Sequence, residues 1–291
     1  MGLIFRLLLG MSLWLGAGLS VLAQERPLVF VSVVPQQYFV ERIAGGLVEV
    51  QAMVQPGFSP HTYEPTPRQI SQLARADLYI RIGVPFEDSW MRRIQGVNPD
   101  MPVLDARTGL KLLPMAEQEG GDEHGHRHEN QFDPHVWTSP RLVEQMSEPM
   151  LDALAKLLPQ HKVVLEQNRQ QFVAELQALD QALARQFAAA PGKRFMVFHP
   201  SWGYLADAYG LTQVAIEADG KEPGARALAQ LIDTARAEGI KSIFVQPQFD
   251  RRMAEQVAEA IGGRVEAIDP LEYAYFDMMH KAANLIAGTV P

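Results

Sequence analysis

The sequence of 291 residues contains no cysteine. The chain therefore forms no disulfide bonds and has no cysteine to which a lipid could be attached. It also lacks an excess of basic residues, because 26 lysines and arginines are outnumbered by 34 aspartates and glutamates. An acidic chain is a poor ligand for nucleic acid and has no polybasic patch for a membrane surface. We therefore expect no nucleic-acid partner and no lipid anchor.

The apolar stretch at the N-terminus is short for a membrane span. Residues 1–23 begin with one positive charge, Arg6, followed by an apolar run to Leu22 and a small residue, Ala23, at the expected cleavage point. The apolar core of about 16 residues is shorter than the roughly 20 that a spanning helix needs. An export signal is therefore favoured over a membrane anchor. We expect a soluble, monomeric protein in the periplasm.

The rest of the chain alternates between short β-branched apolar runs and helix-like segments. This alternation predicts βαβ units, and hence parallel sheets with helices on both faces. The same order of elements occurs in both halves of the chain. The expected strands are 27–34, 47–54, 77–82 and 101–104 in the first half, and 195–198, 211–216, 242–245 and 264–267 in the second.

A segment between the halves, residues 160–190, contains neither glycine nor proline. Six apolar residues follow one another there at helical spacing, which predicts one long helix with a single apolar stripe. They are Leu165, Phe172, Leu176, Leu179, Leu183 and Phe187. The helix either joins two lobes or lies over one domain.

We predict an α/β fold of two lobes, each a mostly parallel sheet with helices on both faces, joined by this long helix. The expected divisions are an export signal at 1–23, an N-terminal lobe at 24–158, a linking helix at 159–190 and a C-terminal lobe at 191–291.

Three of the eight histidines lie in an acidic polar segment, residues 117–131. His124, His126 and His128 alternate there, and short histidine-rich tracts bind divalent transition metals. Binding would order a flexible loop, so a site here should be weak and exchangeable. The alternative is a solvated linker. His161 and His280 lie in ordinary helical contexts, where we expect no role for them.

Three more histidines follow strands or proline-rich turns: His61 in SPHTYEP, His135 in DPHVW and His199 in FHPSWGY. Asp269, in AIDPL, follows the last expected strand in the same way. Loops at the carboxyl ends of parallel strands are where open α/β sheets bind ligands. Three imidazoles and one carboxylate make a reasonable tetrahedral shell for Zn²⁺. Between 64 and 74 residues separate successive members, so they can converge only if the folded lobes face each other.

At these motifs the chain resembles the periplasmic metal-binding subunits of zinc and manganese ABC importers, the ZnuA/TroA-like solute-binding proteins. PGFSPHTYEPTP, DPHVW, FHPSWGYLADAYGL with IEADGKEPGA, and VQPQF with DPL each match one ligand segment of that family. The resemblance implies a metal between two lobes, with ligand roles for His61, His135, His199 and Asp269. It also implies a membrane permease as the partner, with no enzymatic activity.

Within this family, a carboxylate at the third ligand position is typical of manganese proteins. His199 occupies that position here, and imidazole favours zinc. The resemblance leaves open whether Asp269 binds directly, binds through water, or leaves the vertex open. Trp202 and Tyr204 are expected either to wall the cleft or to pack in the core, and Lys221 and Glu222 to shape the cleft or its rim.

Manganese binding by the same fold is the first alternative to zinc binding. A zinc hydrolase is the second, with Glu64 as the nearest general-base candidate, although the chain has no His-Glu-x-x-His helix.

Overall fold

The structure is a computed structural model that describes residues 26–115, 132–188, 192–217 and 222–289. The expected export signal, the segment 117–131 with His124, His126 and His128, and Lys221 lie outside the described residues. Within the described residues, no helix combines the length and apolarity that crossing a membrane requires.

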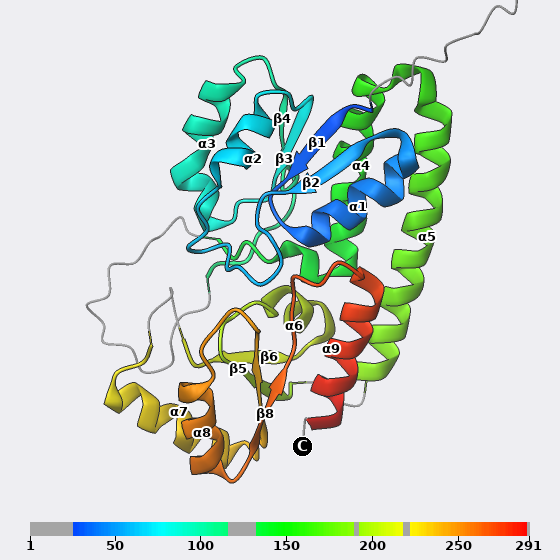
Figure 1. Cartoon of the computed structure of the whole chain (residues 1–291). Helices are drawn as coiled ribbons and strands as arrows, with labels where there is room; N and C mark the ends of the chain where they lie inside the picture. Colours follow the sequence, from blue (N-terminus) through cyan, green and yellow to red (C-terminus); the bar gives the residue numbers. More distant parts are fainter. Residues whose placement is uncertain (1–25, 116–131, 189–191, 218–221, 290–291) are drawn as a thin grey trace, which may run out of the picture.

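Two separate four-stranded parallel sheets form the framework, one in each half of the chain (Figure 1). The strand orders are β2-β1-β3-β4 and β6-β5-β7-β8, so both sheets share one topology. In such a sheet the order reverses beside the first strand, which opens a crevice at the carboxyl ends. The strands are β1 Leu28–Val31, β2 Glu49–Ala52, β3 Leu78–Arg81 and β4 Val103–Asp105, then β5 Arg194–Val197, β6 Thr212–Ala215, β7 Ser242–Val245 and β8 Arg264–Ala267.

Helices cover the sheets, and the predicted α/β class with two sheet-containing halves is confirmed. The first half contains α1 Val34–Ala44, α2 Pro67–Leu73, α3 Pro85–Val97 and α4 Pro140–Leu157, with short 3₁₀ turns at Gly45–Leu47, Val136–Thr138 and Pro159–His161. The second half contains α6 Gly203–Tyr209, α7 Ala225–Ala237, α8 Arg252–Ile261 and α9 Tyr275–Thr289.

The long helix α5, Lys162–Phe187, runs along both halves (Figure 1). Its 26 residues span about 39 Å at a rise of about 1.5 Å per residue. Its buried residues are the six that the apolar stripe predicts: Leu165, Phe172, Leu176, Leu179, Leu183 and Phe187. They pack against α1 and α4 of the first half and against α6 and α9 of the second. The helix therefore joins the two halves, and the alternative of a helix lying over one domain is wrong.

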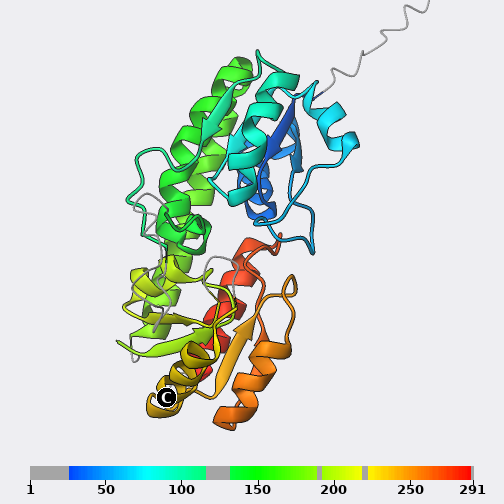
Figure 2. The ribbon, with the colours of Figure 1, turned by 90° about the vertical axis from the view of Figure 1, so that its left-hand side faces the viewer.

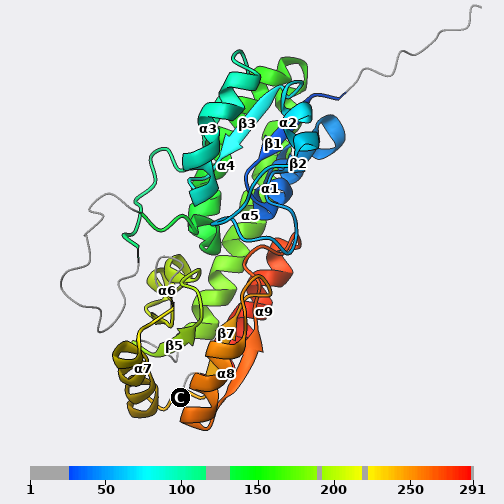
Figure 3. The same cartoon turned by 60° about the vertical axis from the view of Figure 1, so that its left-hand side comes forward.

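Helix α9 lies beside α5 and reaches the first half of the molecule (Figures 1 and 3). The ring of Tyr275 meets Phe39 of α1 edge to face, with 4.9 Å between the ring centroids. One continuous apolar core therefore includes the first sheet, α5 and α9. The view in Figure 2 shows the resulting elongated molecule, with the two halves at opposite ends of its length.

The second sheet has a different apolar layer on each face because side chains alternate along a strand. Phe195 and Val197 of β5 join the continuous core, whereas Met196 and the adjacent Phe198 pack in a second cluster with residues of α7 and α8. With both faces covered, the carboxyl ends of the strands are left as the places where polar side chains can gather.

Helix α4 has no counterpart in the elements predicted from the sequence. It contains Pro149 at an internal position, and proline removes one backbone donor and disfavours helix in a sequence pattern. Its apolar residues, among them Met146, Met150 and Leu154, are buried and pack against α5. Tertiary packing outweighs the local effect of the proline.

Candidate metal centre

His61 lies in the loop between β2 and α2. Thr66 ends this loop as the N-cap of α2, and its hydroxyl accepts a hydrogen bond from the backbone N–H of Gln69. Within the loop, the backbone N–H of His61 donates to Oγ of Ser59 at 3.3 Å. Pro60 is buried, whereas the His61 side chain is partly exposed. The loop is therefore anchored on both sides of a ring that remains accessible.

His135 lies immediately before the 3₁₀ turn Val136–Thr138 and is buried. Its backbone N–H donates to Oδ1 of Asp133 at 2.9 Å, and its ring Nδ1 lies 2.7 Å from the same oxygen. A carboxylate facing Nδ1 favours the tautomer with the proton on that nitrogen. Nε2 of His135 is then left with a lone pair for a metal.

His199 follows β5 at its carboxyl end and is also buried. Its Nδ1 lies 3.2 and 3.3 Å from the two carboxylate oxygens of Glu217. Glu217 follows β6, which pairs with β5 in parallel with Val197 opposite Ala215, so strand pairing brings the two residues together. The Phe249 ring stacks on the His199 ring with 4.8 Å between centroids. His199 therefore has the same carboxylate-backed arrangement as His135.

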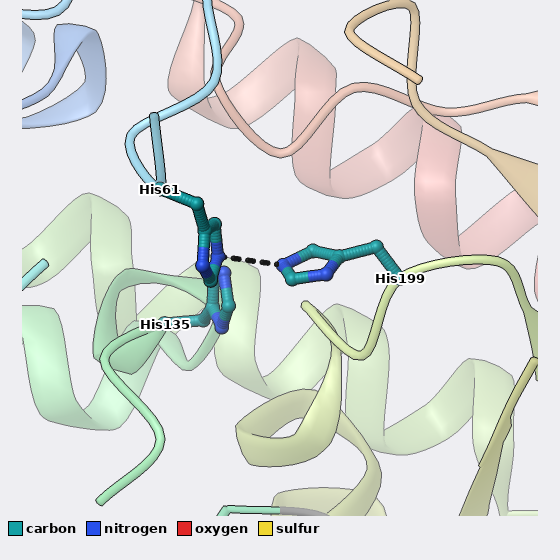
Figure 4. A group of neighbouring side chains, drawn as sticks. All are labelled: His61, His135 and His199. Carbon is teal, nitrogen blue, oxygen red and sulfur yellow. Dashed lines mark hydrogen bonds between the residues drawn. The ribbon is translucent and has the colours of Figure 1, made fainter. Parts of the chain in front are cut away.

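The rings of His61, His135 and His199 converge on one point between the two halves (Figure 4). One ring nitrogen of each lies within 4.8 Å of those of the other two. Nε2 of His61 and Nε2 of His199 are 3.1 Å apart. Two nitrogens bound to one tetrahedral Zn²⁺ at about 2.0–2.1 Å would be about 3.3 Å apart, so the donor set fits such an ion.

The surroundings of His61 and His199 disfavour protonation of these two rings. Burial, reinforced by the nearby rings of His199 and His135, lowers the pKa of His61 to about 3. Burial also lowers the pKa of His199, although the Glu217 carboxylate opposes this effect. A neutral imidazole is the form that binds a metal. The low pKa of His61 therefore keeps its ring ready to bind a cation at neutral and mildly acidic pH.

A cavity surrounds the three rings. Its aromatic lining comes from Trp137 and Phe249, and its polar lining includes Ser201, Gln246 and Gln248. No carboxylate is found among the described residues that line it. The indole Nε1 of Trp137 donates to the backbone oxygen of Pro270 at 2.8 Å. This bond links the His135 segment directly to the loop that follows Asp269.

Asp269, the fourth ligand predicted from the sequence, is not in the group formed by the three rings. The amide nitrogen Nε2 of Gln248 donates to both carboxylate oxygens of Asp269, at 3.1 Å each, and the backbone N–H of Leu271 donates to Oδ1 at 2.9 Å. Burial raises the pKa of this carboxyl group. Direct ligation by Asp269 remains a prediction.

Of the two alternatives for Trp202 and Tyr204, the structure favours packing in the core over a position in the cleft wall. Both side chains are buried, and neither is among the residues that line the cavity. Instead, the hydroxyl of Tyr204 donates to the backbone oxygen of Asp133 at 2.8 Å and accepts from the N–H of Leu113 at 3.0 Å. Through these hydrogen bonds Tyr204 holds the segment that precedes His135, without lining the cavity itself. Trp137 and Phe249 take the wall positions.

The remaining candidates lie away from the three rings. His161 is in the 3₁₀ turn that precedes α5, and His280 is exposed on α9. Glu64 and Glu222 are exposed, and neither lines the cavity. Sequence reasoning missed Asp133 and Glu217. A signal for Asp133 was its position two residues before His135, whereas Glu217 could be found only through the pairing of β5 with β6.

Known proteins resemble this chain over most of its length. The family model described as "ZnuA: Zinc-uptake complex component A periplasmic" matches residues 29–289. The "High-affinity zinc uptake system protein ZnuA" of Bacillus subtilis is 30% identical over 248 residues, which cover 82% of this chain and 76% of that protein. A solved structure entitled "Crystal structure of 138-173 ZnuA deletion mutant plus zinc bound" is 37% identical, with a TM-score of 0.85, and the match covers 91% of this chain and 98% of that one.

A longer relative is the "Zinc-binding lipoprotein AdcA" of Streptococcus pneumoniae serotype 4. It is 31% identical over 246 residues, which cover 82% of this chain but 48% of the relative. The chain thus spans about half the length of this relative.

Proposed function

Because the chain belongs to the ZnuA family of zinc-uptake complex components, we propose that it captures Zn²⁺ between its two halves and delivers it to the membrane permease of an ABC importer. The observation that carries this proposal is the convergence of His61, His135 and His199. The printed names of the relatives from Bacillus subtilis and Streptococcus pneumoniae, which describe zinc uptake and zinc binding, support zinc as the cargo.

The donor set favours zinc over manganese. Three imidazole nitrogens form the group, and no carboxylate of the described residues belongs to it. Imidazole is a good ligand for zinc, whereas manganese prefers oxygen ligands. Manganese binding would require oxygen atoms that the group in this structure does not supply.

In each of the two buried histidines, a carboxylate lies within hydrogen-bond distance of ring atom Nδ1, which leaves Nε2 for the ion. Asp133 faces Nδ1 of His135, and Glu217 faces Nδ1 of His199. Both contacts fix the orientation of the ring and increase the basicity of the opposite nitrogen. Because the two rings are already oriented, binding the ion costs less conformational entropy than it would with freely rotating rings.

Binding is favoured over hydrolysis because, in the part of the chain that the structure describes, no candidate general base lines the cavity. Glu64, the only candidate that the sequence offered near His61, is exposed and does not line the cavity. None of the described residues that line the cavity therefore offers a carboxylate to accept a proton from a zinc-bound water.

The location and assembly of the protein are proposals, and the sequence pattern at residues 1–23 and the family support the location. We propose that residues 1–23 direct export, that the protein acts outside the cytoplasm in the periplasm, and that it works as a monomer. Relatives are named as lipoproteins, but this chain has no cysteine to carry a lipid. We also propose that the divisions at residues 158 and 190 bound the lobes, and that His124, His126 and His128 form a weak second site.

Native mass spectrometry of the purified protein, offered equal amounts of Zn²⁺ and Mn²⁺, tests the main proposal. We expect one tightly held zinc ion per chain and no retained manganese. A protein that retains manganese in preference to zinc, or retains neither ion, would overturn the assignment of zinc as cargo.

A further inference from the structure

A glycine of the second half lies directly against a carboxylate of the first half. Gly203 is the first residue of α6, which lies at the end of the second half that faces the first (Figure 1). A Cβ atom added to Gly203 would lie 2.7 Å from Oδ2 of Asp133. Carbon and oxygen atoms that are not bonded to each other do not approach this closely. The Asp133 carboxylate therefore occupies the space that a side chain at position 203 would need.

The backbone of Gly203 does not explain why a glycine is present there. Glycine is the usual residue where φ is positive, and Gly203 is not among the described glycines with positive φ. Glycine is also a weak helix former, so alanine would favour the first turn of α6. The amide nitrogen of Gln213 would lie at an ordinary distance of 3.7 Å from an added Cβ. The close approach of Asp133 is therefore the physical reason for a glycine at this position.

Asp133 is held on several sides, so it cannot simply move away. It is 5% exposed, and its Oδ1 accepts from the backbone N–H of His135 at 2.9 Å and lies 2.7 Å from Nδ1 of the same residue. Its backbone N–H donates to the oxygen of Leu113 at 2.9 Å, and its backbone oxygen accepts from the Tyr204 hydroxyl at 2.8 Å. A carboxylate displaced from Gly203 would therefore have to rotate about its own side-chain bonds. This rotation would take Oδ1 away from the His135 ring.

A movement of α6 would relieve the same contact, but it would affect the other buried ligand. Gly203 follows His199 by four residues. The backbone N–H of Trp202, between them, donates to Oε1 of Gln213 at 2.7 Å. A shift of the first turn of α6 would therefore break this bond or move the short segment that carries the His199 ring. Either response to a side chain at position 203 would disturb the metal centre.

We propose that Gly203 is a positioning residue of the metal centre. Because it has no side chain, Asp133 can face the His135 ring while α6 contacts the 3₁₀ turn Val136–Thr138 that follows His135. The buried ligands of the two halves are thereby placed relative to each other. Gly203 does not touch the ion and acts through Asp133. This inference rests on the proposed function, because zinc affinity is one of its two readouts.

Zinc affinity and the tautomer of His135 test the proposal on the full chain. G203A adds the one carbon atom that would meet Asp133, and we expect zinc affinity to fall about 10-fold, as for changes behind a ligand. In the metal-free protein, NMR of the imidazole nitrogens should find the His135 proton mainly on Nδ1 in the wild type and less so in G203A.

G96A is the matched control for a glycine-to-alanine change in a helix. Gly96 lies in α3 without a positive φ, and an added Cβ would meet no described atom within 4 Å apart from its own helix and chain neighbours. G96A should therefore match the wild type in zinc affinity and in the tautomer of His135.

A double-mutant cycle distinguishes an effect through Asp133 from a general effect on α6. D133A removes the carboxylate that the new Cβ would meet, and we expect it to lose about 10–100-fold in zinc affinity. Addition of G203A to D133A should then lower the affinity no further, because the two changes act through one contact. If G203A alone fails to fold, D133A/G203A should fold and bind zinc like D133A.

Three results would overturn the proposal while leaving zinc capture intact. The first is a G203A protein with wild-type zinc affinity and an unchanged His135 tautomer. The second is an additive cycle, in which G203A lowers the affinity of D133A as much as that of the wild type. The third is a D133A/G203A protein that does not fold although D133A does. A wild-type protein that binds no zinc would instead contradict the proposed function, and the tautomer of His135 would still test the role of Gly203.

Discussion

Nε2 of His61 and Nε2 of His199 lie 3.1 Å apart, although 138 residues separate them in the chain. His61 comes from a loop of the first sheet and His199 from the end of β5 in the second. Neither half holds both rings. The metal centre therefore forms only when the two halves pack against each other.

Removing a ring from the centre should abolish tight zinc binding. H135A and H199A should each lower zinc affinity by more than about 100-fold, because changes behind a ligand already cost about 10–100-fold. Competition with a chromophoric chelator measures the loss. H280A replaces an exposed histidine of α9 and is the matched control. Wild-type affinity in H135A or H199A would refute the assignment of that ligand.

The carboxylates behind the rings should matter less than the rings themselves. D133N and E217Q keep the shape of each side chain but remove the charge that faces Nδ1 of His135 or His199. We expect each variant to lose about 10–100-fold in zinc affinity. E64Q, at an exposed carboxylate outside the cavity, should bind zinc like the wild type. Equal affinities in all three variants would exclude a positioning role for Asp133 and Glu217.

The bond from Trp137 to Pro270 should stabilise the docked arrangement. W137F keeps an aromatic wall but leaves the buried Pro270 oxygen without its donor. We expect the free energy of unfolding to fall by about 1–3 kcal/mol, measured with urea. W90F replaces a partly buried tryptophan of α3 outside the cavity and should change stability by less than about 0.5 kcal/mol. An equal effect of the two substitutions would show that the Pro270 bond contributes nothing measurable.

The metal-free protein should lose stability in mild acid because of His61. The pKa of His61 is lowered to about 3 in the folded protein by burial and by the neighbouring rings. Between that value and the ordinary value of about 6.5, the unfolded chain takes up a proton that the folded chain refuses. The free energy of unfolding therefore falls as the pH drops through this window and is unaffected by His61 above it.

Replacement of His61 isolates this contribution from those of the carboxylates. H61N cannot take up the proton in either state, so its stability should depend less steeply on pH between about 6.5 and 3 than that of the wild type. Urea unfolding of both proteins with the metal removed makes the comparison. Parallel pH profiles would contradict the lowered pKa of His61.

The sequence predicts the framework well where local patterns and tertiary packing agree. The stripe from Leu165 to Phe187 becomes the buried face of α5, and the strands expected at 242–245 and 264–267 have those bounds in the structure. Helix α4 was missed because Pro149 interrupts its pattern, although packing on α5 stabilises it.

The site is harder to predict from the sequence than the fold is, because it depends on contacts between segments that are far apart in the chain. His61, His135 and His199 could be selected as strand-end or turn residues next to prolines, and the structure brings them together. Asp269 accepts hydrogen bonds from the side chain of Gln248, 21 residues earlier in the chain. A contact over this separation leaves no periodic pattern in the sequence from which it could be predicted. The cavity wall likewise comes from Trp137 and Phe249, which only the docked halves bring beside the rings.

Zinc K-edge X-ray absorption on the purified protein with one equivalent of Zn²⁺ tests the central claim most directly. The account predicts a four-coordinate ion with three imidazole nitrogens at about 2.0–2.1 Å, together with one oxygen ligand. Loss of one imidazole from the spectrum of H199A would attribute that ligand to the second half of the molecule. A zinc ion with one or no imidazole ligand in the wild-type protein would contradict the claim that both halves bind a single ion.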